Sequence, residues 1–268
     1  MKLLPAARKI GLMLLGAIVF LVLLALIQML LQRHHVARAA GETVVIVAAV
    51  AMYAAWVRYV ERRRISELDP ARAAPEGLGG LVLGIVLFSA TIGILWALGV
   101  FRVVGFGSWA VVAPGLLAAL ATAAGEEIVF RGWLFRTVRD VGGTWIGVAV
   151  SAIVFGLLHA FNTGASVVST VAIALEAGVL LALAYAATDR LWLPIGVHTG
   201  WNFTEGSVFG ASVSGHAPGD ALFQGSLSGP VTLTGGIFGP ESSIVGVAVC
   251  LVAAAALVPA TLRRDFRP

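Results

Sequence analysis

Apolar residues in this chain run in long stretches that alternate with short polar ones. Crossing the apolar core of a bilayer takes about 20 residues of helix. Stretches that approach or reach this length lie near residues 10–31, 43–60, 79–100, 109–130, 145–161, 166–187, 191–209 and 243–262. They predict an all-α fold, a polytopic transmembrane helical bundle of about eight spans. The fifth and seventh stretches carry the weakest pattern, because each is short or interrupted by polar residues.

The composition supports a membrane protein. Hydrophobic residues make up 59% and charged residues 12% of the 268 residues, whereas soluble domains carry about 25% charged residues. The single cysteine, Cys250, lies in the last apolar stretch. This excludes a disulfide framework and a thiolate metal centre within the chain.

Basic residues gather in alternate connections between the predicted spans. Because cytoplasmic loops of membrane proteins are rich in Lys and Arg, this alternation predicts that both termini are cytoplasmic. The net charge of +4 then reflects topology, and nucleic acid is not expected as a partner. Fourteen of the 18 basic residues lie on the predicted cytoplasmic side: Lys2, Arg8, Lys9, Arg58, Arg62, Arg63, Arg64, Arg72, Arg136, Arg139, Arg190, Arg263, Arg264 and Arg267.

Two polar segments suggest how the chain is divided. The charged stretch 62–76 contains two prolines and is predicted to be a cytoplasmic linker. It separates an N-terminal two-helix portion with its linker, residues 1–77, from a six-helix body, residues 78–268. Within the body, residues 206–242 are rich in Gly and Ser and predict an extracytoplasmic loop. This loop either packs over a cavity or is a flexible connector.

Polar side chains interrupt three of the apolar stretches at membrane depth. They are Glu126, Glu127 and Arg131 in the fourth, His159 in the fifth, and His198 and Asn202 in the seventh. Ionisable groups inside a bilayer are costly and usually face a polar cavity that serves a function. The sequence therefore predicts one site that is assembled from three helices.

The two adjacent glutamates are expected to differ. Glu127 and Arg131 are four residues apart and can pair on one helix face, whereas Glu126 points about 100° away. An unpaired carboxylate in such a site suits a general base. The alternative is that all three side chains form only a buried polar clamp between helices.

His198 and Asn202 also share one helix face. This face could donate hydrogen bonds to a developing oxyanion or supply ligands to a metal ion. The chain has no His-Glu-x-x-His run and no Gly-x-Ser-x-Gly elbow, so those two hydrolase signatures are absent. Asn162 either lines the same cavity or ends the fifth helix, and Glu176 is either a cavity residue or the partner of an arginine.

The three motifs Glu-Glu-x-x-x-Arg, Phe-x-x-x-His and His-x-x-x-Asn, in this order on separate apolar helices, resemble the CPBP family of membrane proteases. This family includes CAAX prenyl-protein endopeptidases and bacterial Abi-type proteins, and the likeness covers about residues 78–207. The resemblance implies an intramembrane endopeptidase in which Glu126 activates water and His159 helps to hold it. His198 and Asn202 would stabilise the tetrahedral intermediate.

The resemblance leaves the cofactor open. A divalent metal such as zinc would take Glu126, His159 and His198 as ligands, but a metal-independent geometry is preferred. The expected partners are membrane lipid and a membrane-associated protein or peptide substrate, in a bacterial cytoplasmic membrane. Two other functions remain: a non-catalytic membrane scaffold that retains the polar core, and a transporter. A transporter is disfavoured, because the predicted spans do not form two halves with interrupted helices at corresponding positions.

The predicted topology also places the site. The fourth helix would run inward with Glu126 near its end, so the cavity is expected in the cytoplasmic half of the bilayer, opening to the cytoplasm or sideways. His159 would lie about 22 Å along its helix from Thr144. A tilted or late-starting fifth helix is therefore expected.

Overall fold

The computed structural model describes residues 6–265, and each of the eight apolar stretches is helical. Lys2 and Arg267, two residues of the charge count, lie outside the described part. The long helical elements are α1 (Ala6–Arg33), α2 (Arg38–Ala55) with η1 (Trp56–Val60), α3 (Pro70–Ala97), α4 (Val112–Glu127) with η3 (Ile128–Phe135) and α5 (Arg136–Gly142), α6 (Thr144–His159), α7 (Val167–Ile173) with η4 (Ala174–Gly178) and α8 (Val179–Thr188), α9 (Trp192–Phe203) with η5 (Thr204–Val208), and α11 (Ile244–Asp265).

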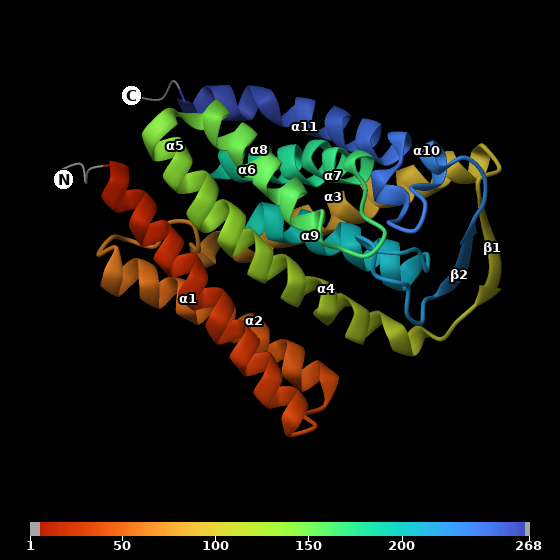
Figure 1. Ribbon diagram of the computed structural model, residues 1–268, viewed down its shortest axis with the longest axis horizontal. Helices are drawn as coiled ribbons and strands as arrows, with labels where there is room; N and C mark the ends of the chain where they lie inside the picture. The colour runs from red at the N-terminus through yellow and green to blue at the C-terminus, as the bar shows by residue number, and fades with distance from the viewer. Residues whose placement is uncertain (1–5, 266–268) are drawn as a thin grey trace.

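The polytopic helical bundle is thus confirmed. Among the described residues, six helices are long and apolar enough to cross a membrane. The fifth and seventh stretches, which carried the weakest pattern, form the shorter helices α6 and α9. Every residue of α9 from Pro194 to Trp201 is buried. This helix is therefore enclosed by the rest of the bundle (Figure 1).

Glycines bring α9 into close contact with α3. A methyl group added at Gly80 or Gly84 of α3 would collide with the backbone of α9, and one added at Gly196 or Gly200 would collide with α3. Such small-xxx-small faces let two helix backbones approach in a membrane. His198 lies midway between the two α9 glycines in sequence. Its side chain contacts α4, the helix with the first motif.

The first and second motifs lie on a helical hairpin. The fourth helix continues as α5 to Gly142, twelve residues beyond its predicted end at 130, and α6 begins at Thr144. Gly143 adopts a φ of +89° where the chain reverses, a conformation that glycine adopts without strain. Glu126 precedes Gly142 by 16 residues, and His159 follows Gly143 by 16 residues.

This hairpin corrects the predicted depth of the site. Both side chains lie about 24 Å along their helices from the same turn, so Glu126 is in the middle of its helix. The expectation of a late-starting fifth helix is wrong. The apolar stretch ended early because the last turns of the fourth helix carry polar residues, including Arg136, Arg139 and Asp140.

The two ends of the bundle differ in structure. The start of α1 and the end of α11 lie at one end (Figure 1), where Lys9 pairs with Asp140 and Arg264 pairs with Asp189. At the opposite end, β1 (Phe101–Phe106) and β2 (Phe223–Leu227) form a small antiparallel sheet. This sheet is an addition to the expected all-α fold, and the aromatic and β-branched residues of β1 were its signal.

Short elements complete the sheet end. They are η2 (Trp109–Val111), α10 (Val231–Thr234) and η6 (Pro240–Ser242). The N-terminal helices α1 and α2 pack on α4, η3 and α5. The division into residues 1–77 and 78–268 stays a prediction.

Candidate active site

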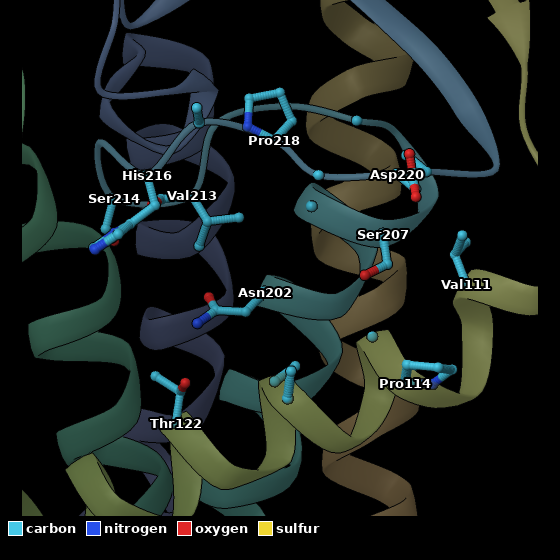
Figure 2. A pocket seen from close by; sticks show the side chains of 18 of the residues that line it. Val111, Pro114, Thr122, Asn202, Ser207, Val213, Ser214, His216, Pro218 and Asp220 are labelled. Carbon is cyan, nitrogen blue, oxygen red and sulfur yellow. The ribbon is translucent and has the colours of Figure 1, made fainter. Parts of the chain in front are cut away.

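The three motifs meet at one cavity of about 1310 Å³. Glu126, His159, His198 and Asn202 all line it. Asn202 faces this space in Figure 2, with Thr122 of α4 on one side and Ser214 and His216 on the other. The four side chains thus share one cavity, whereas their closeness around a single water molecule and their chemical roles stay predictions.

The cavity lies towards the end of the bundle that carries the small sheet. Its walls include the first turns of α4, from Pro114 to Thr122, and loop residues between Gly206 and Gly225. The linker packs at the other end of the bundle, where the backbone carbonyl of Asp69 accepts a hydrogen bond from Trp192 Nε1 at the start of α9. The expectation that the cavity opens towards the end with the arginine-rich linker is therefore wrong. The middle position of Glu126 in its helix is the physical reason.

Glu127 and Arg131 form the predicted pair. Arg131 Nη1 donates to Glu127 Oε1 at 2.8 Å, and both side chains are fully buried. Arg131 Nη2 also donates to the carbonyls of Ala177 and Gly178, at 3.2 and 3.1 Å. The pair therefore ties the fourth helix to the span that contains η4 and α8.

His198 extends this buried chain of contacts. Its Nδ1 lies 3.0 Å from Glu127 Oε1. Because a carboxylate only accepts hydrogen bonds, Nδ1 carries the hydrogen and Nε2 faces the other way. Nε2 lies 3.9 Å from Glu126 Oε2. The side chain of Glu126 is 32% exposed and that of Glu127 is fully buried, so the two adjacent glutamates have different environments.

His159 is oriented by its own helix. Its Nδ1 lies 2.8 Å from the carbonyl oxygen of Phe155, and its ring packs 4.5 Å from the Phe155 ring. A carbonyl oxygen only accepts hydrogen bonds, so Nδ1 is again the protonated nitrogen. The Nε2 atom of His159 is then left as an acceptor at the site.

Asn162 meets both expectations, the end of the fifth helix and the wall of the cavity. It follows the end of α6 and also lines the cavity. Its Nδ2 donates to the carbonyl of Ser214 at 2.9 Å. This bond connects the turn after α6 to the loop that follows α9.

Glu176 has no arginine partner among residues 6–265. It is buried on η4, and its Oε1 accepts a hydrogen bond from the thiol of Cys250 at 3.7 Å. It lines a second, small cavity of about 20 Å³ that His159, His198 and Asn202 also line. This volume is enough for about one water molecule. Of the two alternatives, the cavity residue fits the structure.

Two further buried glutamates lie near the site and were missed in the sequence. In the part of the chain described, neither carboxylate oxygen of Glu205 has a hydrogen-bond partner. Glu241 lies beside it, and burial raises the pKa of Glu241 to about 7, although the Ser214 hydrogen bond opposes this shift. The signal for Glu205 was an acidic residue three positions after Asn202, inside an apolar stretch.

Three of the buried charged residues lie on π-helical turns. Arg131 is on η3, Glu176 on η4 and Glu205 on η5. Such turns are rare, and they occur frequently at functional sites. Nothing in the sequence pattern marks them, because they depend on how the neighbouring helices pack.

The arrangement of potential ligand side chains decides whether a metal ion can bind, because the ion needs several ligands around one point. Between residues 6 and 265, no group of three or more His, Cys, Asp or Glu side chains is arranged to hold one. Glu126, His159 and His198, the ligand set considered from the sequence, share the cavity but do not form such a group. These residues therefore do not fit a metal ion as they stand.

Comparison with known proteins finds one family model that is similar to the segment with the three motifs. Residues 107–204 match the family model of the type II CAAX prenyl endopeptidase Rce1-like proteins. No curated protein and no solved structure matches the chain. The matched segment contains all three motifs and ends before the loop that lines part of the cavity. The resemblance predicted from the motifs is thereby confirmed: over residues 107–204, this membrane protein is similar to the Rce1-like family of endopeptidases.

Proposed function

We propose that this protein is an intramembrane endopeptidase that hydrolyses peptide bonds of membrane-associated proteins or peptides with a water activated by Glu126. The observation that carries the proposal is the contrast between the two motif glutamates. Glu127 is fully buried between Arg131 and His198, whereas Glu126 is open to the cavity. Glu126 Oε2 has no hydrogen-bond partner among the described residues.

In the proposed reaction, Glu126 takes a proton from a water molecule that also hydrogen-bonds to His159. The water oxygen attacks the carbonyl carbon of the peptide bond, and the carbonyl oxygen becomes an oxyanion. The protonated Glu126 then gives its proton to the nitrogen of the peptide bond. The oxyanion re-forms the carbonyl as the C–N bond breaks, which releases the amine and leaves a carboxyl group on the other fragment. A positioned carboxyl group contributes about 100-fold to 10,000-fold to such a reaction.

His198 and Asn202 would stabilise the oxyanion. Asn202 donates from its amide nitrogen. His198 donates from Nε2 while its Nδ1–H remains directed at Glu127, which requires the imidazolium form. The carboxylates of Glu127 and Glu126 flank the ring at 3.0 and 3.9 Å and favour this positive charge. Arg131 holds Glu127 in place through the hydrogen bond from its Nη1 to Glu127 Oε1.

The cavity supports a peptide as the substrate. Its volume of about 1310 Å³ exceeds the roughly 300–1,000 Å³ of pockets for small molecules. A non-catalytic scaffold is less well supported, because an unpaired carboxylate in a membrane protein is costly. A scaffold would gain nothing from keeping Glu126 open to a cavity. The name of the family adds prenylated proteins as one class of substrate to try.

The proposal is tested with purified protein in liposomes. A pool of lipidated, fluorescence-quenched peptides is incubated with the wild type and with Glu126→Gln, whose amide cannot accept the proton. We expect turnover to fall by about 100-fold or more while the melting temperature is retained. Full turnover by Glu126→Gln would show that the assigned base is wrong.

The same assay tests the metal. We expect turnover to persist in EDTA, because the proposed steps use side chains of this chain alone. Loss of turnover in EDTA that zinc restores would favour the metal-dependent alternative. The melting curve in EDTA distinguishes loss of chemistry from loss of structure.

A further inference from the structure

Loop residues 213–216, named here the roof segment, form part of the cavity wall. Val213, Ser214 and His216 line the cavity, and Figure 2 shows them across the space from Asn202 and Thr122. This segment lies outside residues 107–204, the part that matches the family model. The cavity is therefore completed by a region that the family likeness does not describe.

Two side chains from distant parts of the chain hold the backbone of Ser214. Its N–H donates to Glu241 Oε1 at 2.5 Å, and its carbonyl accepts a hydrogen bond from Asn162 Nδ2 at 2.9 Å. Asn162 belongs to the turn after α6, and Glu241 belongs to η6. Both polar backbone atoms of Ser214 are thus bound by side chains and not by a regular element.

Backbone bonds support the same segment from other directions. Gly215 N–H donates to the carbonyl of Phe238 at 2.7 Å. Just before the roof segment, Ala211 N–H donates to the carbonyl of Glu205 at 3.0 Å. Ser214 has a φ of +47°, which is uncommon for a residue other than glycine. A backbone in this conformation needs its surroundings to hold it.

We propose that Asn162 and Glu241 are positioning residues that hold the roof segment over the cavity, so that this segment forms one wall of the peptide-binding surface. The inference rests on the proposed proteolytic function. Neither side chain needs to touch the reacting atoms, because each acts through the backbone of Ser214. Release of the roof segment should therefore weaken substrate binding more than it slows the chemical step.

Kinetics of matched variants test the proposal. Asn162→Ala and Glu241→Ala each remove one hydrogen bond from Ser214. We expect KM to rise about fivefold, the effect of one typical hydrogen bond, with kcat within about twofold. Glu241→Gln keeps an oxygen that accepts the Ser214 N–H, so its KM should stay close to that of the wild type.

The double variant separates a shared role from two independent ones. Once either bond is lost, the roof segment is released, so Asn162→Ala/Glu241→Ala should resemble the worse single variant. Effects that simply multiply would indicate independent contributions and would contradict the proposal. Glu76→Ala is the control, because Glu76 pairs with Arg190 at the opposite end of the bundle. Its KM should not change.

Hydrogen exchange supplies a readout that does not need activity. In detergent, the amides of residues 211–216 should exchange slowly in the wild type and about fivefold faster in Asn162→Ala and Glu241→Ala, with Glu241→Gln unchanged. An inactive wild-type protein would refute the proposed function and leave this measurement intact. Unchanged exchange in folded Asn162→Ala and Glu241→Ala would refute the positioning role.

Discussion

The two ends of the bundle differ in whether their carboxylates have cationic partners. At the end with the linker, five carboxylates meet a cation, from the buried Glu67 to the exposed Asp140. The pairs are Glu61 with Arg63 and Arg136, Glu67 with Arg63, Glu76 with Arg190, Asp140 with Lys9, and Asp189 with Arg139 and Arg264. On the cavity side, no lysine or arginine pairs with Glu126, Glu176, Glu205 or Glu241 within residues 6–265.

This difference separates stability from function. A carboxylate that is removed from water is tolerated when a cation and hydrogen bonds replace the water. The linker end follows this rule and joins segments that are far apart in the sequence. Unpaired buried carboxylates weaken a fold. Their concentration around one cavity indicates that this region serves function at a cost in stability. The cation Arg131 lies beside this region and pairs with the neighbouring carboxylate of Glu127.

The largest expected effect comes from removing that cation. Arg131→Ala leaves Glu127 buried without its charge partner, and such a loss costs about 3–5 kcal/mol. Thermal melting in detergent measures the change. Arg131→Lys is the matched control, because it keeps the charge but not the fork of donors to Glu127, Ala177 and Gly178. A melting temperature for Arg131→Ala equal to that of the wild type would contradict the comparison.

Acid should weaken the linker end through Glu67. Burial by itself raises the pKa of this carboxyl, but hydrogen bonds from Arg63 and Tyr53 outweigh burial and lower it from 4.5 to about 2. A lowered pKa stabilises the folded state above pH 4.5, and this contribution is lost as the pH falls from 4.5 towards 2. It amounts to ~3 kcal/mol.

Melting curves between pH 7 and pH 3 check this prediction. The wild type should lose stability over the window below pH 4.5. Glu67→Gln, which cannot titrate, should start lower at pH 7 and lose less on acidification. Parallel curves for the two proteins would show that Glu67 does not supply the acid sensitivity.

The smallest effect is expected at Glu76. Its ion pair with Arg190 is partly exposed, with the two side chains 15% and 21% accessible, and pairs of this kind contribute about 0–1 kcal/mol. Glu76→Ala should lower the melting temperature slightly at low salt and hardly at all at high salt. A loss as large as that of Arg131→Ala would remove the distinction between exposed and buried pairs.

The sequence by itself determined the features that depend on local pattern. Hydropathy located the helices, because a span must be apolar over its own length. The spacing of Glu127 and Arg131 predicted their pair, since residues four apart on a helix are neighbours wherever the helix lies. The cost of polar groups in lipid was enough to predict that Glu126, His159, His198 and Asn202 share one cavity.

Only the tertiary structure decided the relations between distant segments. His198 and Glu127 are 71 positions apart in the sequence. No local pattern specifies which of the two adjacent glutamates His198 contacts. The side to which the cavity opens depended on polar helical turns beyond the apolar stretch, which hydropathy does not count. The position of the roof segment depends on hydrogen bonds between Ser214 and the side chains of Asn162 and Glu241. Buried backbone groups of an irregular loop need partners, and only the packing of distant segments determines which side chains supply them.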